Sequence, residues 1–86
     1  MTIIRTRNPS LIFPEDVLKY GWELAYIIAN IPQCINGDGS LPFKENLYDF
    51  PSFNMLFERS DFYAKLDFLI ENGVAYVVKS SEVDNV

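Results

Sequence analysis

The 86-residue chain contains no histidine. This absence excludes Ser-His and Cys-His nucleophile pairs, and it removes the commonest general base and the commonest zinc ligand. Carboxylates remain as acid–base candidates, but a catalytic pair needs two contrasting environments. Asp67 and Glu71 are spaced i, i+4 on the same predicted solvent-facing side of a helix, so they lack that contrast. We therefore expect a protein that is not an enzyme.

Cysteine is nearly absent as well, since Cys34 is the one cysteine of the chain. A single thiol cannot form an intramolecular disulfide, which excludes a disulfide scaffold and fits a reducing compartment. Long apolar runs are missing too: the most apolar stretch, residues 24–31, has 8 residues, whereas a bilayer span needs roughly 20. With no signal-peptide pattern at the start, the expected location is the cytoplasm.

Glycine is scarce, with four residues, and no Gly-rich phosphate loop is present. Gly37 and Gly39 lie in residues 36–40, whose oxygen-bearing side chains invite comparison with a calcium-binding EF-hand loop. The comparison fails at both demanding positions, because the sixth is Leu41 instead of Gly and the twelfth is Leu47 instead of Glu. We expect a turn-rich connection, no metal site and no cofactor.

Positive charge is scarce as well. The chain has seven Lys and Arg but twelve Asp and Glu, which gives a net charge of −5. Arg5 and Arg7 lie among the first 13 residues, where there is no acid, so residues 14–86 hold five bases against twelve acids and a net charge of −7. Such a body repels nucleic-acid phosphates and anionic membranes. The expected partner is a protein with a basic or an apolar surface, with no membrane, and nucleic acid is disfavoured.

The length and the residue pattern predict a small single α+β domain over residues 1–86. The expected order of elements is strand, helix, loop, helix, helix, strand. β-Branched side chains predict a strand over residues 2–7, and an apolar run predicts a second strand over residues 74–79. These strands are expected to pair in a short sheet, while residues 80–86 are expected to form a flexible tail.

The first predicted helix spans residues 14–31. It begins at Pro14, has a single narrow stripe of polar side chains, and ends before Pro32. Because it is apolar on most sides, we expect it to be the central element of the core. Gly21 lies inside it at a cost of about 1 kcal/mol, which suggests a close packing contact.

Two shorter helices are predicted in the second half of the chain. One covers residues 51–59. The other covers residues 61–72, with Ser60 as its N-cap. It ends at Gly73, the expected left-handed residue of a Schellman motif.

The segment from residue 61 to residue 79, a helix running into an apolar strand, resembles the recognition helix and first wing strand of winged-helix domains. Residues 51–59 and 14–31 would be the preceding helices. The resemblance implies an alternative function, a nucleic-acid-binding transcriptional regulator using Arg5, Arg7, Lys65 and Lys79. Its recognition helix, however, has three acids against one base, where phosphate contact requires Lys and Arg. A winged-helix-like chain of this charge would sooner bind protein.

Aromatic side chains are abundant, at 15% of the chain, and 8 of the 13 lie between residues 43 and 68. They either build the core beneath residues 14–31 or project outward as a binding patch, because Tyr and Phe are frequent at interface cores. The sequence leaves both alternatives open. An exposed aromatic patch would equally suit a homodimer seam.

These exclusions favour a non-catalytic protein-binding module that acts as a regulator or inhibitor through an acidic, aromatic-containing face. Phage-encoded inhibitors, nucleic-acid mimics and toxin-immunity proteins are the analogous classes. An acidic face speeds encounter with a basic partner. The residues expected to contact the partner are Glu45, Tyr48, Asp49, Glu58, Asp61, Tyr63, Asp67 and Glu71.

Overall fold

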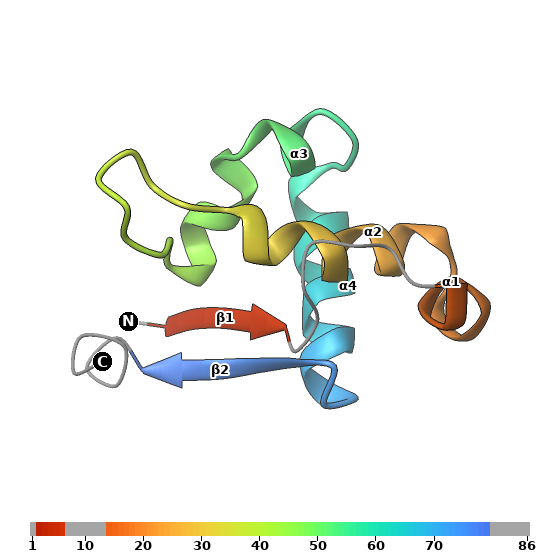
Figure 1. The fold of residues 1–86 in the computed structure, drawn as a ribbon. Coiled ribbons are helices and arrows are strands. Elements are labelled where there is room, and N and C mark those ends of the chain that lie inside the picture. Colours follow the sequence, from red (N-terminus) through yellow and green to blue (C-terminus); the bar gives the residue numbers. More distant parts are fainter. Residues whose placement is uncertain (1, 7–13, 80–86) are drawn as a thin grey trace.

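The computed structural model describes residues 2–6 and 14–79 of the chain (Figure 1). In chain order the elements are β1 (Thr2–Thr6), α1 (Pro14–Tyr20), α2 (Trp22–Asn30), the 3-10 helices η1 (Ile31–Gln33) and η2 (Lys44–Asp49), α3 (Pro51–Asn54), α4 (Arg59–Glu71) and β2 (Ala75–Lys79). The predicted α+β class is confirmed. Arg7 and the predicted tail over residues 80–86 lie outside the described residues.

The sheet joins the first and last described elements, as predicted. β1 and β2 are antiparallel and lie side by side, in a register that runs from Thr2 opposite Lys79 to Thr6 opposite Ala75 (Figure 1). At the end of β1, the buried Thr6 hydroxyl donates a 3.0 Å hydrogen bond to the carbonyl of Ile28 in α2. This bond satisfies a buried polar group and fixes the sheet against α2.

The core lies where the sheet, α2, η2, α3 and α4 meet. Helix α2 crosses in front of α4 in Figure 1, and the sheet lies below α2, beside the lower part of α4. The largest fully buried side chains come from all four helices: Phe53, Phe62, Ile27, Ile28, Leu47, Leu66 and Leu69. The predicted central role of residues 14–31 is therefore carried by α2.

The prediction of one continuous helix over residues 14–31 is wrong, because Gly21 divides α1 from α2. Gly21 has φ 89° and ψ 165°, a backbone conformation that glycine adopts readily and other residues avoid. No atom lies within 4 Å of the position that a Cβ would take on Gly21. The expected close packing contact is thus absent, and glycine is needed here for its backbone instead of its small size.

The middle of the chain also departs from the prediction. The expected loop over residues 32–46 is interrupted by η2, and α3 ends at Asn54 instead of residue 59. Backbone amides of Met55, Leu56 and Phe57 still donate to the carbonyls of Pro51 and Phe53, and two tyrosine side chains bind α3 and the segment after it to the rest of the fold. The Tyr26 hydroxyl donates to the carbonyl of Ser52 at 2.9 Å, and the Tyr48 hydroxyl donates to the carbonyl of Phe57.

Helix α4 starts two residues earlier than expected and ends at Glu71, one residue before the predicted end. Its N-cap is Glu58 instead of Ser60, and no side chain caps it. At its end Gly73 has φ 73°. The amides of Gly73 and Val74 donate to the carbonyls of Ile70 (3.1 Å) and Leu69 (2.9 Å). These two bonds make the Schellman motif, which turns the chain from α4 into β2.

Candidate functional site

Most of the aromatic run between residues 43 and 68 lies in the core or packs against it, since Tyr48, Phe50 and Tyr63 are partly buried against the buried rings. Phe53, Phe57 and Phe62 are buried. The Phe62 ring centroid lies 4.6 Å from that of Phe53 and 5.0 Å from that of Tyr63. Phe68 is the member of the run that remains substantially exposed, at 44%. The core alternative therefore holds for the buried rings, and a binding surface must be sought elsewhere.

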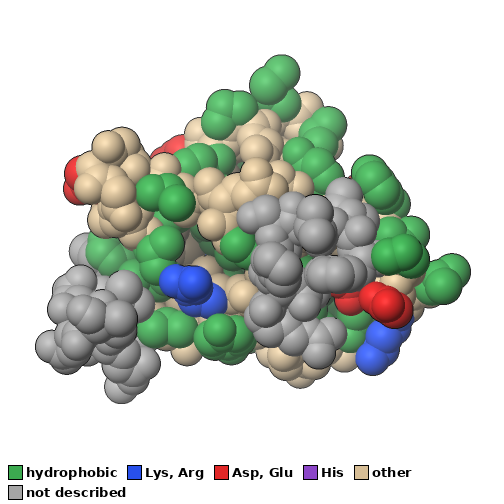
Figure 2. Space-filling model, in the orientation of Figure 1, with side chains coloured by type: hydrophobic (Ala, Val, Ile, Leu, Met, Phe, Trp, Pro, Cys, Tyr) green, Lys and Arg blue, Asp and Glu red, His purple; other side chains and the backbone are tan. Residues whose placement is uncertain are grey.

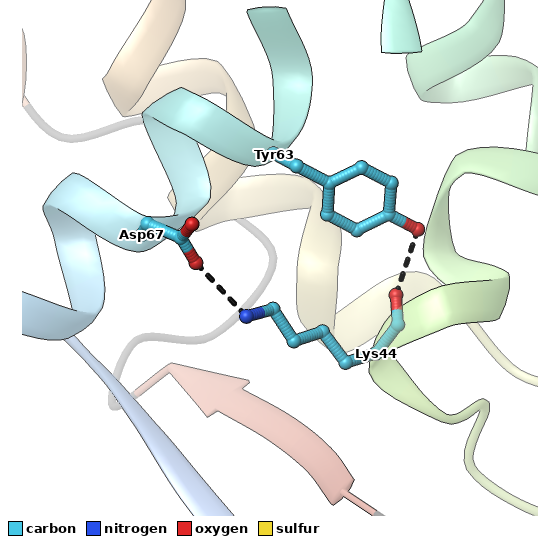
Figure 3. A network of polar contacts seen from close by, with 3 residues as sticks. All are labelled: Lys44, Tyr63 and Asp67. Carbon is cyan, nitrogen blue, oxygen red and sulfur yellow. Dashed lines mark hydrogen bonds and ion pairs between the residues drawn. The ribbon is translucent and has the colours of Figure 1, made fainter. Parts of the chain in front are cut away.

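Tyr48 and Tyr63, two of the predicted contact residues, are partly buried and do not project as exposed rings. The Tyr63 hydroxyl donates to the carbonyl of Lys44 at 2.9 Å (Figure 3), and the Tyr48 hydroxyl is bound within the chain as well. The guanidinium of Arg59 lies 5.8 Å from the Tyr48 ring centroid and 5.4 Å from that of Tyr63. Both distances are within the range of cation–π attraction.

Three of the predicted acids gather around these tyrosines. Asp67 Oδ1 lies 2.9 Å from Lys44 Nζ, which connects α4 to η2 (Figure 3). Burial raises the pKa of Tyr63, the charge of Arg59 opposes this rise, and the charges of Asp49 and Glu45 add to it. Five predicted residues thus lie near one another on η2 and α4, and two contacts of Lys44, with Asp67 and with Tyr63, connect these two helices.

The other three predicted residues lie outside that cluster. Asp61 is on another side of α4, because two residues along a helix turn the side chain by about 200° from Tyr63. Glu58 and Glu71 are exposed at opposite ends of α4. The eight residues named from the sequence therefore do not share one face of the molecule.

A hollow of the described surface lies between the α1–α2 junction and α4. It has a volume of about 460 Å³, and we call it the α2–α4 groove. One wall carries the Trp22 ring, which is 59% exposed. The other wall is formed by Asp61, Ala64, Lys65 and Phe68. These four positions are spaced i, i+3, i+4 and i+7, so they lie along one face of α4.

The polar part of the groove is an ion-pair network with one base. Lys65 Nζ lies 2.7 Å from Asp61 Oδ1 and 3.9 Å from Glu23 Oε2. The Lys65 side chain is 23% exposed, whereas that of Glu23 is 61% exposed. Lys65 therefore connects α4 to α2, and its shorter contact is with Asp61.

A second hollow continues the groove toward α3. It has a volume of about 170 Å³ and is also lined by Trp22 and Glu23, together with Tyr26, Leu56 and Phe57. Leu56 is exposed, as is the neighbouring Met55. In Figure 2 hydrophobic side chains project where α3 and the turn after it lie and along the edge formed by α1. Trp22 thus stands between two hollows on an apolar stretch of surface.

The sequence prediction missed Trp22 because it placed this ring on the buried sides of a continuous helix. Two signals were present. Residues 14–31 carry apolar side chains on nearly every side, more than one core can cover, and a glycine directly precedes the tryptophan. Leu18, in α1, is also exposed. The break at Gly21 therefore changes which side chains of this segment reach the core.

Cys34 has the environment of a structural thiol. It is buried, and its Sγ donates to the carbonyl of Asn30 at 3.4 Å. Burial raises the pKa of Cys34 to about 11. The thiol is therefore protonated at neutral pH and is a poor nucleophile.

The segment over residues 36–40 is a turn stabilised by its own side chains. Asp38 Oδ1 accepts hydrogen bonds from the Ser40 amide (3.0 Å) and the Ser40 hydroxyl (2.6 Å). These bonds lower the pKa of Asp38. Asn36 Nδ2 also donates to Ser40 Oγ, at 3.0 Å. The oxygen-rich sequence thus serves the turn.

Within residues 2–6 and 14–79, no group of three or more acids and cysteines is placed to hold a metal ion. None of the helices in that part of the chain combines the length and apolarity needed to cross a bilayer. The winged-helix resemblance remains one of element order. Comparisons of the chain with protein-family models, with curated proteins and with solved structures find no match.

Proposed function

We propose that the chain is a non-catalytic protein-binding module that docks its partner in the α2–α4 groove. The observation that carries this proposal is the exposed Trp22 between two hollows. Burying a large apolar side chain stabilises a protein by about 1.5–3 kcal/mol. Leaving the indole in water forgoes that gain within the monomer, whereas a partner that covers the ring recovers it. Tryptophan is also among the residues most enriched at the energetic centres of interfaces.

The surroundings of Trp22 support the same function. Phe68 and Leu56 extend the apolar surface on either side of the ring. Glu23, Asp61 and Lys65 provide charged groups beside it. An apolar centre with a polar rim is the usual arrangement of a protein–protein interface. A small module of this kind acts by covering a surface of its partner, which is how a regulator or inhibitor works.

Asp61 is the predicted contact residue that lines the groove. For the other seven, a role in partner binding stays a prediction. The nucleic-acid alternative has less support, because Lys65, one of its four bases, is engaged by two carboxylates. A mobility-shift assay at low salt distinguishes the two functions, since a groove that binds protein predicts no shift.

The test compares two exposed aromatic side chains, one that lines the groove and one that lies on the sheet. Trp22→Ala should weaken binding to a partner captured with the full chain by about 30-fold, the effect of losing a contact of about 2 kcal/mol. Tyr76→Ala removes a ring of similar exposure from β2 and should leave the affinity unchanged. Calorimetric titration measures both variants. Equal affinities for wild type and Trp22→Ala would refute docking in the groove.

A further inference from the structure

The α2–α4 groove holds more negative than positive charge. Glu23 and Asp61 supply two carboxylates, and Lys65 is the one base among the residues that line it. The ammonium of Lys65 is 2.7 Å from Asp61 and 3.9 Å from Glu23. Asp61 is therefore well paired, whereas Glu23 is at the outer limit of an ion pair. One negative charge is left uncompensated, and the side chain that carries it is largely exposed.

The walls of the groove suit a helical segment. The volume of about 460 Å³ lies within the range of roughly 300–1,000 Å³ that binding pockets occupy. One wall is a face of α4 from Asp61 to Phe68, and the other is the junction of α1 and α2. Apolar side chains of a partner helix at i, i+3, i+4 and i+7 enter such grooves in other complexes. Here they would pack against Trp22 and Phe68.

The charge of the groove also argues against a second copy of this chain. The whole chain has a net charge of −5. A symmetric dimer would place the same surface on both sides of the contact. Two grooves facing each other would bring together two Glu23 carboxylates, and juxtaposed like charges oppose association. A basic segment of a different protein meets no such opposition.

We infer that the occupant of the groove is an amphipathic, basic segment of another protein. Its apolar side chains cover Trp22 and Phe68, and a Lys or Arg binds the Glu23 carboxylate. An Arg would offer the planar fork that binds a carboxylate with two hydrogen bonds. This inference rests on the proposed function and adds the chemistry of the partner.

The probe is a peptide-display library, selected on the full chain and counter-selected on the Trp22→Ala variant. The enriched sequences should combine apolar residues at helical spacing with Lys or Arg and should lack Asp and Glu. One enriched peptide is then synthesised and titrated. Trp22 is the one tryptophan of the chain, so a tryptophan-free peptide can be followed by the blue shift of the indole emission as the ring leaves water.

Three charge variants test the role of Glu23. Glu23→Gln should weaken binding of the synthetic peptide by about three- to fivefold, the scale of an exposed ion pair. Lys65→Met keeps the apolar stem and removes the competing cation, so it should tighten binding by a similar factor. Glu15→Gln, at an exposed position of α1 that does not line the groove, should change nothing. Thermal unfolding of each variant separates these effects from loss of fold.

Any result other than those expected above would contradict the inference. Enrichment of neutral or acidic peptides that need Trp22 would overturn the basic partner and leave the proposed function standing. An unchanged affinity in Glu23→Gln, or weaker binding in a folded Lys65→Met, would do the same. A dimer that sedimentation detects and Trp22→Ala dissolves would make the occupant a second copy. If no selected peptide depended on Trp22, the proposed function itself would fail.

Discussion

Replacing Phe62 by leucine should destabilise the protein far more than the same change at Phe68. Both rings lie on α4, but Phe62 is fully buried and Phe68 is 44% exposed. Four ring centroids surround Phe62, those of Phe53 at 4.6 Å, Tyr63 at 5.0 Å, and Tyr48 and Phe57 at 5.9 and 6.3 Å.

The magnitude follows from these contacts. A close aromatic pair contributes about 0.5–1.5 kcal/mol beyond area burial, and Phe62 has two such neighbours. Leucine fills most of the volume and limits the cavity cost. The free energy of unfolding should therefore fall by about 2–3 kcal/mol in Phe62→Leu and by less than about 0.5 kcal/mol in Phe68→Leu. At the stability usual for 86 residues, about 4–13 kcal/mol, the first variant remains folded.

Urea unfolding followed by far-ultraviolet circular dichroism measures both values. Thermal unfolding should show Tm lower by about 10–20 °C in Phe62→Leu. Equal losses in the two variants would refute the division of the aromatic run into a buried part and an exposed part. A negligible loss in Phe62→Leu would show that the ring cluster does not carry the core.

Three further predictions concern single residues. Gly21→Ala should lower the free energy of unfolding by about 1 kcal/mol or more in urea titrations, since φ at Gly21 is strained for alanine; Gly37→Ala, where φ is ordinary, should be nearly neutral. The free energy of unfolding should fall as pH rises from 9.0, the ordinary pKa of Cys34, toward about 11, the pKa of Cys34 in the folded protein. The reason is that the unfolded state releases the proton first. Cys34→Ala should remove this part of the pH dependence. Tyr63→Phe removes the donor to the Lys44 carbonyl and should cost about 1 kcal/mol in the same urea assay, and no loss would make that bond dispensable.

The two strands and the turn at Gly73 could be predicted from the sequence because each is indicated by neighbouring residues. An apolar run predicted the second strand, and Gly73 after a helical segment predicted the left-handed turn that the structure confirms. The pairing of β1 with β2 followed because few other strands were available. These inferences needed no knowledge of how the helices cross.

The site could not be predicted because it depends on a break in the helical period. A continuous helix over residues 14–31 places Trp22 on a buried side, but Gly21 interrupts the rotation from residue to residue. The same limit applies to the aromatic run. Phe62 and Phe68 lie about 240° apart around α4, and only the neighbours of that helix decide which ring is covered. Composition indicated a surplus of rings without indicating where they lie.

The register that sets Thr2 opposite Lys79 has a consequence for synthesis on the ribosome. Strand β1 is made before the other described elements and finds its partner only when β2, the last of them, has been made. Ile3 and Ile4, both buried in the finished fold, therefore have no paired strand beside them while the helices between β1 and β2 are made. Long-range pairing of this kind slows folding and leaves apolar strand edges open to wrong contacts meanwhile. Pairing of β1 with β2 is therefore the last step in forming the fold of the described residues.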